Sequence, residues 1–366
     1  MKIAILGTRG IPNNYGGFEQ CAEFLSIGLV KKGHSVTVYS PSFHPFNEPF
    51  YKGVQIIKKN SPQNIFGKSA SNFIYDYLCL KDATKKDFDI ILQLGLITSA
   101  LSIIFCKHRG KTIVTNIDGL EWKRSKWNRL VQKLTRLLEK YGVKYSDYLI
   151  ADNLAIKDYL FEKYNVESRK IEYGTVPLEK PDISFLQKYR MSEGNYIVTI
   201  ARLEPENNIE MICDGYINSK IKMPYYIIGN HLTDYGDFLK DKYRGYDIKF
   251  LGGIYDKNCL DSIRYYSFCY IHGHSVGGTN PALLEAMAAK ALIVAHKNRF
   301  NRSVINDDAF YFSSAYDITK ILKRSNLLLD KNKFIANNCK KIDQLYSWRV
   351  IVDKYEEYFL EILNKK

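Results

Sequence analysis

A glycine-bearing turn between an apolar run and a helix-like run is the stretch of this sequence best suited to hold an anion. Phe268–Ile271 is apolar enough for a buried strand, and Ala282–Ala289 has the composition of a helix. Thr279 and Asn280 are candidate N-caps, and Pro281 suits the first helical position. A helix N-terminus presents free N–H groups and a positive dipole end, so the stretch predicts an anion site.

The turn itself supplies residues that could contact an anionic ligand with sugar hydroxyls. His274, Gly277 and Gly278 lie in the turn, and Glu285 comes one helical turn later. Glycine lets a ligand approach the backbone closely, and a carboxylate accepts hydrogen bonds from sugar hydroxyls. The alternative is an ordinary strand-to-helix turn with a solvated Glu285.

A second stretch with phosphate chemistry follows an earlier apolar run. Arg202 lies at the end of that run, where its planar guanidinium could bond two phosphate oxygens. Asn207 and Asn208 could cap the next helix and also donate to phosphate. The alternative is a structural ion pair between Arg202 and Glu204 or Glu206.

The first half of the chain carries a long glycine loop, residues 7–17, between its first strand-like run and its first helix-like run. The spacing differs from Gly-x-Gly-x-x-Gly, and no acid follows the second run, so a dinucleotide oxidoreductase is disfavoured. The loop suits a diphosphate, although a flexible surface loop is the alternative. Arg9, Tyr15, Gly16 and Gly17 of this loop are therefore candidate binding residues.

Asp118 follows another strand-like run and could orient or deprotonate an acceptor hydroxyl. The alternative is a turn in which Asp118 binds backbone before Gly119. Trp122, close by in the sequence, is a further candidate for acceptor contact.

Strand-like and helix-like runs alternate along all 366 residues, which predicts an α/β protein with parallel sheets. We expect two doubly wound Rossmann-like domains facing across a cleft, residues 1–176 and 182–347, and a helix at 348–366 that crosses back to the first domain. The predicted strands are Lys2–Leu6, Ser35–Tyr39, Val54–Ile57, Asp89–Leu94, Thr112–Asn116, Tyr148–Ala151, Lys170–Tyr173, Tyr196–Ile200, Tyr225–Ile228, Ile248–Leu251, Phe268–Ile271, Leu292–Ala295 and Ala309–Tyr311.

Charge is unevenly distributed along the chain. Residues 1–180 hold 27 Lys and Arg against 17 Asp and Glu, and the whole chain has a formal charge of +14. This favours an anionic partner.

The seven cysteines form no Cys-x-x-Cys pair, which favours reduced thiols and a cytoplasmic location. Ile90–Cys106 carries no charge, but its length and polar residues favour a strand and a buried helix over a membrane span.

Residues 126–141 show a helical period with two different faces. Lys126, Arg129, Lys133, Arg136 and Lys140 form a basic face, and Trp127, Leu130, Val131, Leu134, Leu138 and Tyr141 form an apolar face. This pattern predicts a helix that contacts an anionic membrane surface. An ordinary packed helix with a solvated basic face is the alternative.

Other chemistries find little support in the sequence. His272 and His274 have no carboxylate at metal-ligand spacing, and no Ser-His-Asp nucleophile elbow is present. We therefore predict no metal and no cofactor. Nucleic-acid binding through the basic first half is disfavoured, because no known binding motif accompanies the charge.

Taken together, these stretches resemble the retaining GT-B glycosyltransferases of family four, over essentially the whole chain. The resemblance implies two Rossmann-like domains, a nucleotide-sugar held mainly by the second, an acceptor on the first, and no required metal. It also implies that Glu285 contacts the donor ribose, that Arg202 stabilises the leaving diphosphate, and that the base is recognised by the loop after residues 251–255, a stretch that includes Ile254. By the same resemblance, Gly16 and Gly17 would contact the donor, and Arg9 and Tyr15 the acceptor.

Three positions depart from the pattern of that family. Asn207 replaces its usual lysine, Gly277 replaces the first of two glutamates eight residues apart, and Asp118 stands where it usually carries histidine. The motifs at residues 7–12, 15–19, 118–122 and 273–281 resemble the bacterial rhamnosyltransferases of capsule and cell-wall polysaccharide assembly.

The resemblance implies transfer of L-rhamnose from dTDP-L-rhamnose, with retention, to a lipid-linked saccharide. We expect a cytoplasmic protein that is peripheral on the inner face of the cell membrane. The alternatives are a transferase that uses a UDP- or GDP-linked sugar and a nucleotide-sugar epimerase of the same fold.

Overall fold

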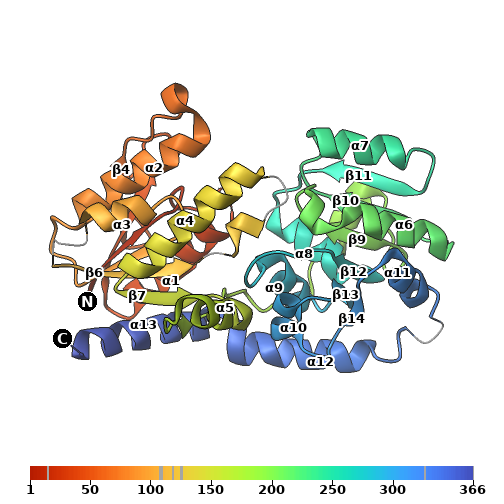
Figure 1. Ribbon diagram of the computed structural model, residues 1–366. Helices are drawn as coiled ribbons and strands as arrows, with labels where there is room; N and C mark the ends of the chain where they lie inside the picture. The colour runs from red at the N-terminus through yellow and green to blue at the C-terminus, as the bar shows by residue number, and fades with distance from the viewer. Residues whose placement is uncertain (15, 107–109, 118, 124–126, 325–326, 366) are drawn as a thin grey trace. The chain divides into compact units, whose positions relative to one another are not determined.

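The computed structural model of the protein describes residues 1–14, 16–106, 110–117, 119–123, 127–324 and 327–365. It divides into two compact units (Figure 1). The first comprises Met1–Lys123, Trp127–Gly174 and Trp348–Lys366, and the second contains Thr175–Ser347. Each is built on a mainly parallel sheet with helices on both faces, so the predicted α/β class with two Rossmann-like domains is confirmed.

The sheet of the first unit has, within the described residues, the strand order β3-β4-β2-β1-β5-β6-β7-β8. All neighbours are parallel except β3 and β4, which form a short antiparallel hairpin. The strands are β1 (Lys2–Leu6), β2 (Ser35–Pro41), β3 (Phe50–Tyr51), β4 (Val54–Lys59), β5 (Ile90–Leu94), β6 (Thr112–Ile117), β7 (Tyr148–Ala151) and β8 (Arg169–Lys170).

Helices cover both faces of this sheet, because right-handed crossovers that run in opposite directions from β1 place their helices on opposite sides. α1 and α13 pack together on one face, while α2, α3 and α4 form a row on the other. These helices and α5 are α1 (Gly17–Lys31), α2 (Gln63–Ala83), α3 (Ala100–Cys106), α4 (Arg129–Tyr145), α5 (Leu154–Tyr164) and α13 (Trp348–Asn364).

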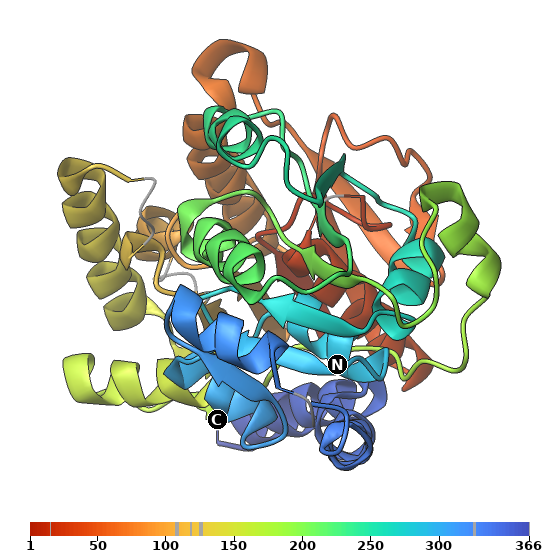
Figure 2. The ribbon, with the colours of Figure 1, turned by 90° about the vertical axis from the view of Figure 1, so that its right-hand side faces the viewer.

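The sheet of the second unit has the described order β11-β10-β9-β12-β13-β14, and every pair is parallel (Figure 2). Its strands are β9 (Ile197–Ile200), β10 (Tyr225–Ile228), β11 (Ile248–Gly252), β12 (Cys269–His272), β13 (Ile293–His296) and β14 (Phe310–Phe312). Its α-helices are α6 (Ile209–Ser219), α7 (Asp234–Lys242), α8 (Lys257–Tyr265), α9 (Pro281–Ala288), α10 (Arg299–Ile305), α11 (Ala315–Leu322) and α12 (Lys331–Lys341).

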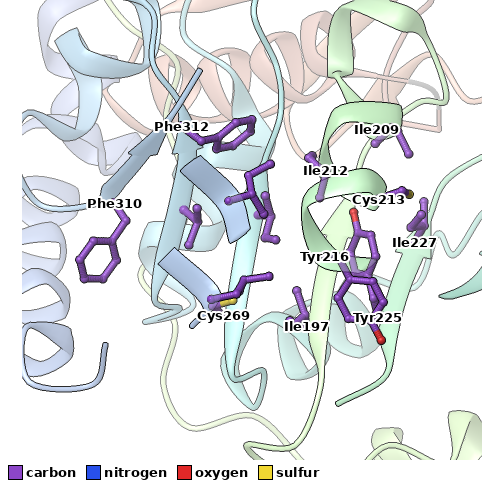
Figure 3. Packing of buried hydrophobic residues seen from close by; sticks show 14 of the residues in the cluster. Ile197, Ile209, Ile212, Cys213, Tyr216, Tyr225, Ile227, Cys269, Phe310 and Phe312 are labelled. Atoms are coloured by element: carbon purple, nitrogen blue, oxygen red, sulfur yellow. The ribbon is translucent and has the colours of Figure 1, made fainter. Parts of the chain in front are cut away.

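One core of the second unit fills the space between the sheet and helices α6, α7 and α11 (Figure 3). Ile212 and Tyr216 of α6 belong to the same buried cluster as Ile197 of β9 and Tyr225 of β10. The strands are short and apolar because both faces of the sheet are covered. This packing fixes the strand ends from which the candidate site is built.

The sequence missed some elements. β3 was not predicted, because a strand of two residues leaves no periodic signal. It joins β4 through a turn at Lys52 and Gly53, which both have positive φ. The last predicted strand of the first domain, Lys170–Tyr173, is displaced to Arg169–Lys170.

The uncharged stretch Ile90–Cys106 forms β5 and α3, as expected. No helix among the described residues is long and apolar enough to span a membrane.

Candidate functional site

The second sheet changes direction between β9 and β12. From β9 the chain continues to β10 and β11 on one side, and from β12 it continues to β13 and β14 on the other. Ligands of doubly wound folds bind at the carboxyl ends of the strands at such a switch point. The loops that follow β9 and β12 are residues 201–208 and 273–280, the two stretches to which the sequence assigned phosphate chemistry.

Hydrogen bonds join these two loops. Asn208 Nδ2 donates to the carbonyl oxygen of Gly273 at 2.7 Å. The backbone N–H and hydroxyl of Ser275 both donate to the carbonyl oxygen of Glu206, at 3.0 and 2.8 Å. A Cβ at Gly273 would lie 1.9 Å from the carbonyl oxygen of Asn207, so only glycine fits here. The loops therefore form one continuous surface at the switch point.

Asn207 and Asn208 act within this surface rather than as side-chain caps. Asn207 is buried, and its amide donates to the carbonyl oxygen of Arg202 at 2.7 Å while its oxygen lies 2.9 Å from Nδ1 of His274. Asn208 is the N-cap residue of α6 by position, in a left-handed conformation, but its side chain makes no capping bond. The prediction that both side chains cap the helix is wrong, because both are used to hold the loops together.

Arg202 is exposed at the end of β9. In the part of the chain that the structure describes, no carboxylate lies within ion-pair distance of its guanidinium, so the alternative of a pair with Glu204 or Glu206 is not found. An unpaired guanidinium at a strand end is available to bind an anion.

Glu285 lies on α9 and pairs with Arg264 of α8. The Arg264 guanidinium is 2% exposed and donates to Oε2 of Glu285 at 2.6 Å. The other terminal nitrogen of Arg264 lies 3.4 Å from Asp261. The Glu285 side chain is 19% exposed, so one carboxylate oxygen is fixed by a buried cation while part of the group still reaches the surface.

The N-terminus of α9 has the predicted cap. Asn280 Oδ1 accepts a hydrogen bond from the backbone N–H of Ala282 at 2.9 Å, and Pro281 is the first helical residue. Gly277 has φ of +139°, a conformation that other residues rarely adopt, and Gly278 and the buried Thr279 follow it into the helix. The turn before α9 therefore has the backbone geometry expected of an anion site.

Two asparagines at the start of α10 hold His274 in place. Asn298 and Asn301 each donate from Nδ2 to the carbonyl oxygen of His274 at 3.0 Å. Burial lowers the pKa of His272 well below its usual value, and His274 and His296 add to the effect; burial also lowers the pKa of His296. Both His272 and His296 are therefore neutral at pH 7 and add no charge to the site.

Ile254 lies in the loop between β11 and α8, at the same edge of the sheet. Because β10 separates β11 from β9, this loop begins two strands away from Arg202. The structure therefore places Ile254 outside the two joined loops, in a separate loop of the same sheet edge.

The glycine loop of the first unit occupies the equivalent switch point, between β1 and β5. Gly7 has φ of +81°, and a Cβ there would lie 1.9 Å from the carbonyl oxygen of Leu94. The backbone N–H of Arg9 donates to Oε1 of the buried Glu19 at 2.7 Å. Gly16 is the N-cap of α1 and Gly17 its first residue, so both lie at a helix N-terminus.

Three predicted positions lie outside the described residues: Tyr15, Asp118 and Lys126. Trp122 is described and partly exposed. Its indole N–H donates to the hydroxyl of Tyr159 at 3.2 Å, and the Arg136 guanidinium lies 4.1 Å from its ring centre. Trp122 is thus held on one side by α4 and α5.

Sequence reasoning missed Arg264, Asn298, Asn301 and Glu19 as residues that shape these loops. Asn298 is the N-cap of α10, which its position before a helix-like run could have indicated. Arg264 has no local signal, because its partner Glu285 is 21 positions away on another helix. Among the described residues, no group of His, Cys, Asp and Glu side chains is placed to hold a metal ion.

Comparison with known proteins identifies a matching family and a shared fold. Residues 1–176 match a family described as a domain of unknown function (DUF1972). An uncharacterized glycosyltransferase of Methanocaldococcus jannaschii is 23% identical over 402 aligned residues, which cover 100% of this chain and 99% of that protein.

Solved structures share the fold over its full length. Sucrose-phosphate synthase from Thermosynechococcus elongatus has a TM-score of 0.83 at 14% identity and covers 100% of both chains. HepE of Anabaena in complex with UDP-glucose has a TM-score of 0.71 at 14% identity, again over 100% of both chains. The protein thus has the GT-B fold, and the class that the comparisons support is a glycosyltransferase of GT-B type.

Proposed function

We propose that this protein transfers a sugar from a nucleoside-diphosphate donor, L-rhamnose from dTDP-L-rhamnose, to a lipid-linked saccharide, with retention at the anomeric carbon. The observation that carries the proposal is the pair of joined loops at the switch point of the second sheet. These loops combine Arg202, which has no carboxylate partner among the described residues, with the N-terminus of α9. The bacterial surface polysaccharides are the products that the sequence resemblance implies.

The chemistry of the donor follows from the charges in this site. When the glycosidic bond to the donor breaks, negative charge grows on the leaving diphosphate. The guanidinium of Arg202 and the backbone N–H groups around Gly278 and Thr279 would stabilise that charge without rearranging. The part of Glu285 that Arg264 leaves exposed would accept hydrogen bonds from the ribose hydroxyls.

The acceptor is assigned to the first unit. Asp118 would orient or deprotonate the attacking hydroxyl, and Arg9, Tyr15 and Trp122 would contact the saccharide. These roles rest on the sequence resemblance. A lipid-linked acceptor requires the protein to work at the inner face of the cell membrane.

A UDP-linked sugar is the second candidate donor, because HepE has this fold and was solved with UDP-glucose. Gly277 stands where the resembled family carries a glutamate for the donor sugar, and a deoxy sugar such as rhamnose has one fewer hydroxyl to bind. This favours dTDP-rhamnose over UDP-glucose.

A donor panel separates these possibilities. The full chain is incubated with dTDP-rhamnose, UDP-glucose, UDP-galactose and GDP-mannose, each with and without a lipid-linked disaccharide acceptor, and the products are read by mass. We expect an acceptor-dependent mass increase of one deoxyhexose with dTDP-rhamnose alone. A hexose added from a UDP or GDP sugar would refute the rhamnose assignment, and donor isomerisation without acceptor would indicate an epimerase.

A further inference from the structure

Helix α4, drawn in yellow in Figure 1, carries a stripe of large apolar side chains that are exposed. Leu130, Leu134, Leu137 and Tyr141 are 76%, 53%, 48% and 38% exposed. Their spacing of four, three and four residues places them within about 60° of arc on the helix. The helix is held to the unit by its other side, where Leu138, Gly142 and Val143 are among the buried residues. The sequence had grouped Leu130 and Leu134 with Leu138 on one apolar face, but the structure buries only Leu138 of these three.

The same surface is strongly cationic. Arg129, Lys133, Arg136, Lys140 and Lys144 of α4 are all exposed. The single acid of this helix is Glu139, which is 3% exposed and accepts hydrogen bonds from Tyr159 and Tyr164 of α5 at 2.5 and 2.7 Å. The exposed part of α4 therefore carries five positive charges, a continuous apolar stripe and no negative charge.

The neighbouring helix α3 also exposes large apolar side chains. α3 packs against α4, contains no charged residue and exposes Leu101 by 43% and Phe105 by 69%. Exposed clusters of large apolar side chains on a folded protein mark a surface that binds something. The cations select the partner, because a surface that combines leucines with lysines and arginines matches the acyl–headgroup boundary of an anionic bilayer.

We propose that α4 and α3 dock the protein on an anionic lipid bilayer, with the stripe Leu130, Leu134, Leu137 and Tyr141 inserted at the level of the headgroups and the cations of α4 on lipid phosphates. Insertion explains the exposed leucines, which attraction of charges alone would not require. The proposed sugar transfer is not needed for this conclusion, because none of these residues belongs to the candidate donor site.

Vesicle sedimentation of the full chain, without any sugar substrate, tests the proposal. Vesicles of neutral phosphatidylcholine are compared with vesicles in which about a third of the lipid is anionic phosphatidylglycerol, at about 50 mM and about 500 mM salt. We expect binding to anionic vesicles that high salt weakens without abolishing, because the inserted stripe is not screened. Equal binding to both kinds of vesicle, or no binding to either, would overturn the proposal.

Matched variants separate insertion from attraction of charges. Leu130→Ser with Leu134→Ser should weaken binding at least tenfold, while the control Leu232→Ser with Leu329→Ser, at positions 79% and 77% exposed in the second unit, should not. Lys133→Glu with Lys140→Glu should weaken low-salt binding at least tenfold. The control for this charge reversal is Lys222→Glu with Lys323→Glu, at two exposed positions of the second unit, and it should bind as wild type does. A leucine variant that binds as tightly as wild type would overturn insertion.

A fluorescent side chain within the stripe measures directly how deeply α4 inserts into the bilayer. Tryptophan fluorescence of Leu134→Trp, corrected for the wild-type signal, should be quenched by lipids brominated on their acyl chains. Absence of quenching on bound vesicles would overturn the proposal. Self-association of the wild-type chain in the absence of lipid, lost in the leucine variant, would assign the stripe to a second copy of the chain instead.

Discussion

Arg202 and Glu285 carry opposite charges in the candidate donor site, and their surroundings differ. Arg202 is exposed and unpaired within the described chain, whereas Glu285 is held by a buried guanidinium. A substitution at Arg202 therefore alters ligand binding with little effect on folding. A substitution at Glu285 affects both, because it also changes the environment of Arg264.

Arg202→Lys keeps the positive charge but loses the planar pair of donors. We expect transfer to fall about tenfold or more, since one bidentate contact to the leaving diphosphate is lost. The melting temperature should match wild type, because the side chain contacts no carboxylate in the described residues. Full activity of the lysine variant in initial-rate measurements would show that the bidentate contact is not used.

Glu285→Gln should weaken donor binding about tenfold or more in calorimetry, because a charge-assisted hydrogen bond to the ribose is lost. It should also lower the free energy of unfolding by about 1–3 kcal/mol, since the buried Arg264 loses its carboxylate partner. Glu193→Gln, at an exposed position, is the control and should change neither quantity. Unchanged donor affinity in a folded Glu285→Gln variant would leave only the structural role.

At the scale of elements, the site depends on how the loops after β9 and β12 are joined. Asn207→Ala removes the hydrogen bonds to the Arg202 carbonyl and to His274. We expect a loss of about 1–3 kcal/mol in unfolding free energy and weaker donor binding, because buried polar atoms lose their partners. Chemical denaturation and calorimetry measure the two effects. Donor affinity at the wild-type value would show that the joined loops do not position the ligand.

A second prediction concerns Asp76, a fully buried acid of α2. Burial raises its pKa from 3.8 to about 7, although a hydrogen bond with Thr98 acts in the opposite direction. The folded protein thus binds this proton more tightly than the unfolded chain, so the contribution to stability is complete below about pH 4 and is lost as the pH rises towards 7.

Asp76→Asn removes that dependence. We expect the wild type to lose a few kcal/mol of unfolding free energy relative to this variant between about pH 5 and pH 8. Denaturant titrations of both proteins at the two pH values measure the difference, and the variant serves as its own control for all other titrating groups. Parallel pH dependence of the two proteins would contradict a raised pKa at Asp76.

The extent to which the sequence predicted the fold varies between elements. Apolar runs such as Tyr225–Ile228 identified strands correctly, because strands covered on both faces are continuously apolar. The cap and first turn of α9 followed from Asn280 and Pro281. Local chemistry and short-range periodicity decide these features.

Features that depend on distant partners were not predictable. The pairing of Arg264 with Glu285 joins two helices, and the exposure of Leu130 and Leu134 depends on which side of α4 packs against the rest of the unit. A hydrophobic period shows on which side of a helix the apolar residues lie. It does not show how many of them the rest of the protein buries. Asn207 matched a phosphate-binding position in sequence, yet its amide is occupied by backbone and histidine partners.

At the scale of the whole molecule, the proposal divides the work between the two units, with the donor on the second and the acceptor on the first. Asp118→Asn, in the first unit, should abolish transfer while leaving the affinity for dTDP within about twofold of wild type, because it removes an acceptor contact only. Calorimetry with dTDP and a product assay measure the two effects. Lost nucleotide affinity in this variant would contradict the division.

Nucleotide binding by the full chain tests the central claim most directly, because it needs no knowledge of the acceptor. Calorimetric titrations with dTDP, UDP and GDP are carried out on wild type, Arg202→Ala and the exposed control Lys222→Ala. The account predicts saturable binding of a nucleoside diphosphate, dTDP most tightly, weakened about tenfold or more by Arg202→Ala and unchanged by the control. Absence of binding for all three nucleotides, or equal affinity in wild type and Arg202→Ala, would contradict a donor site at the joined loops of β9 and β12.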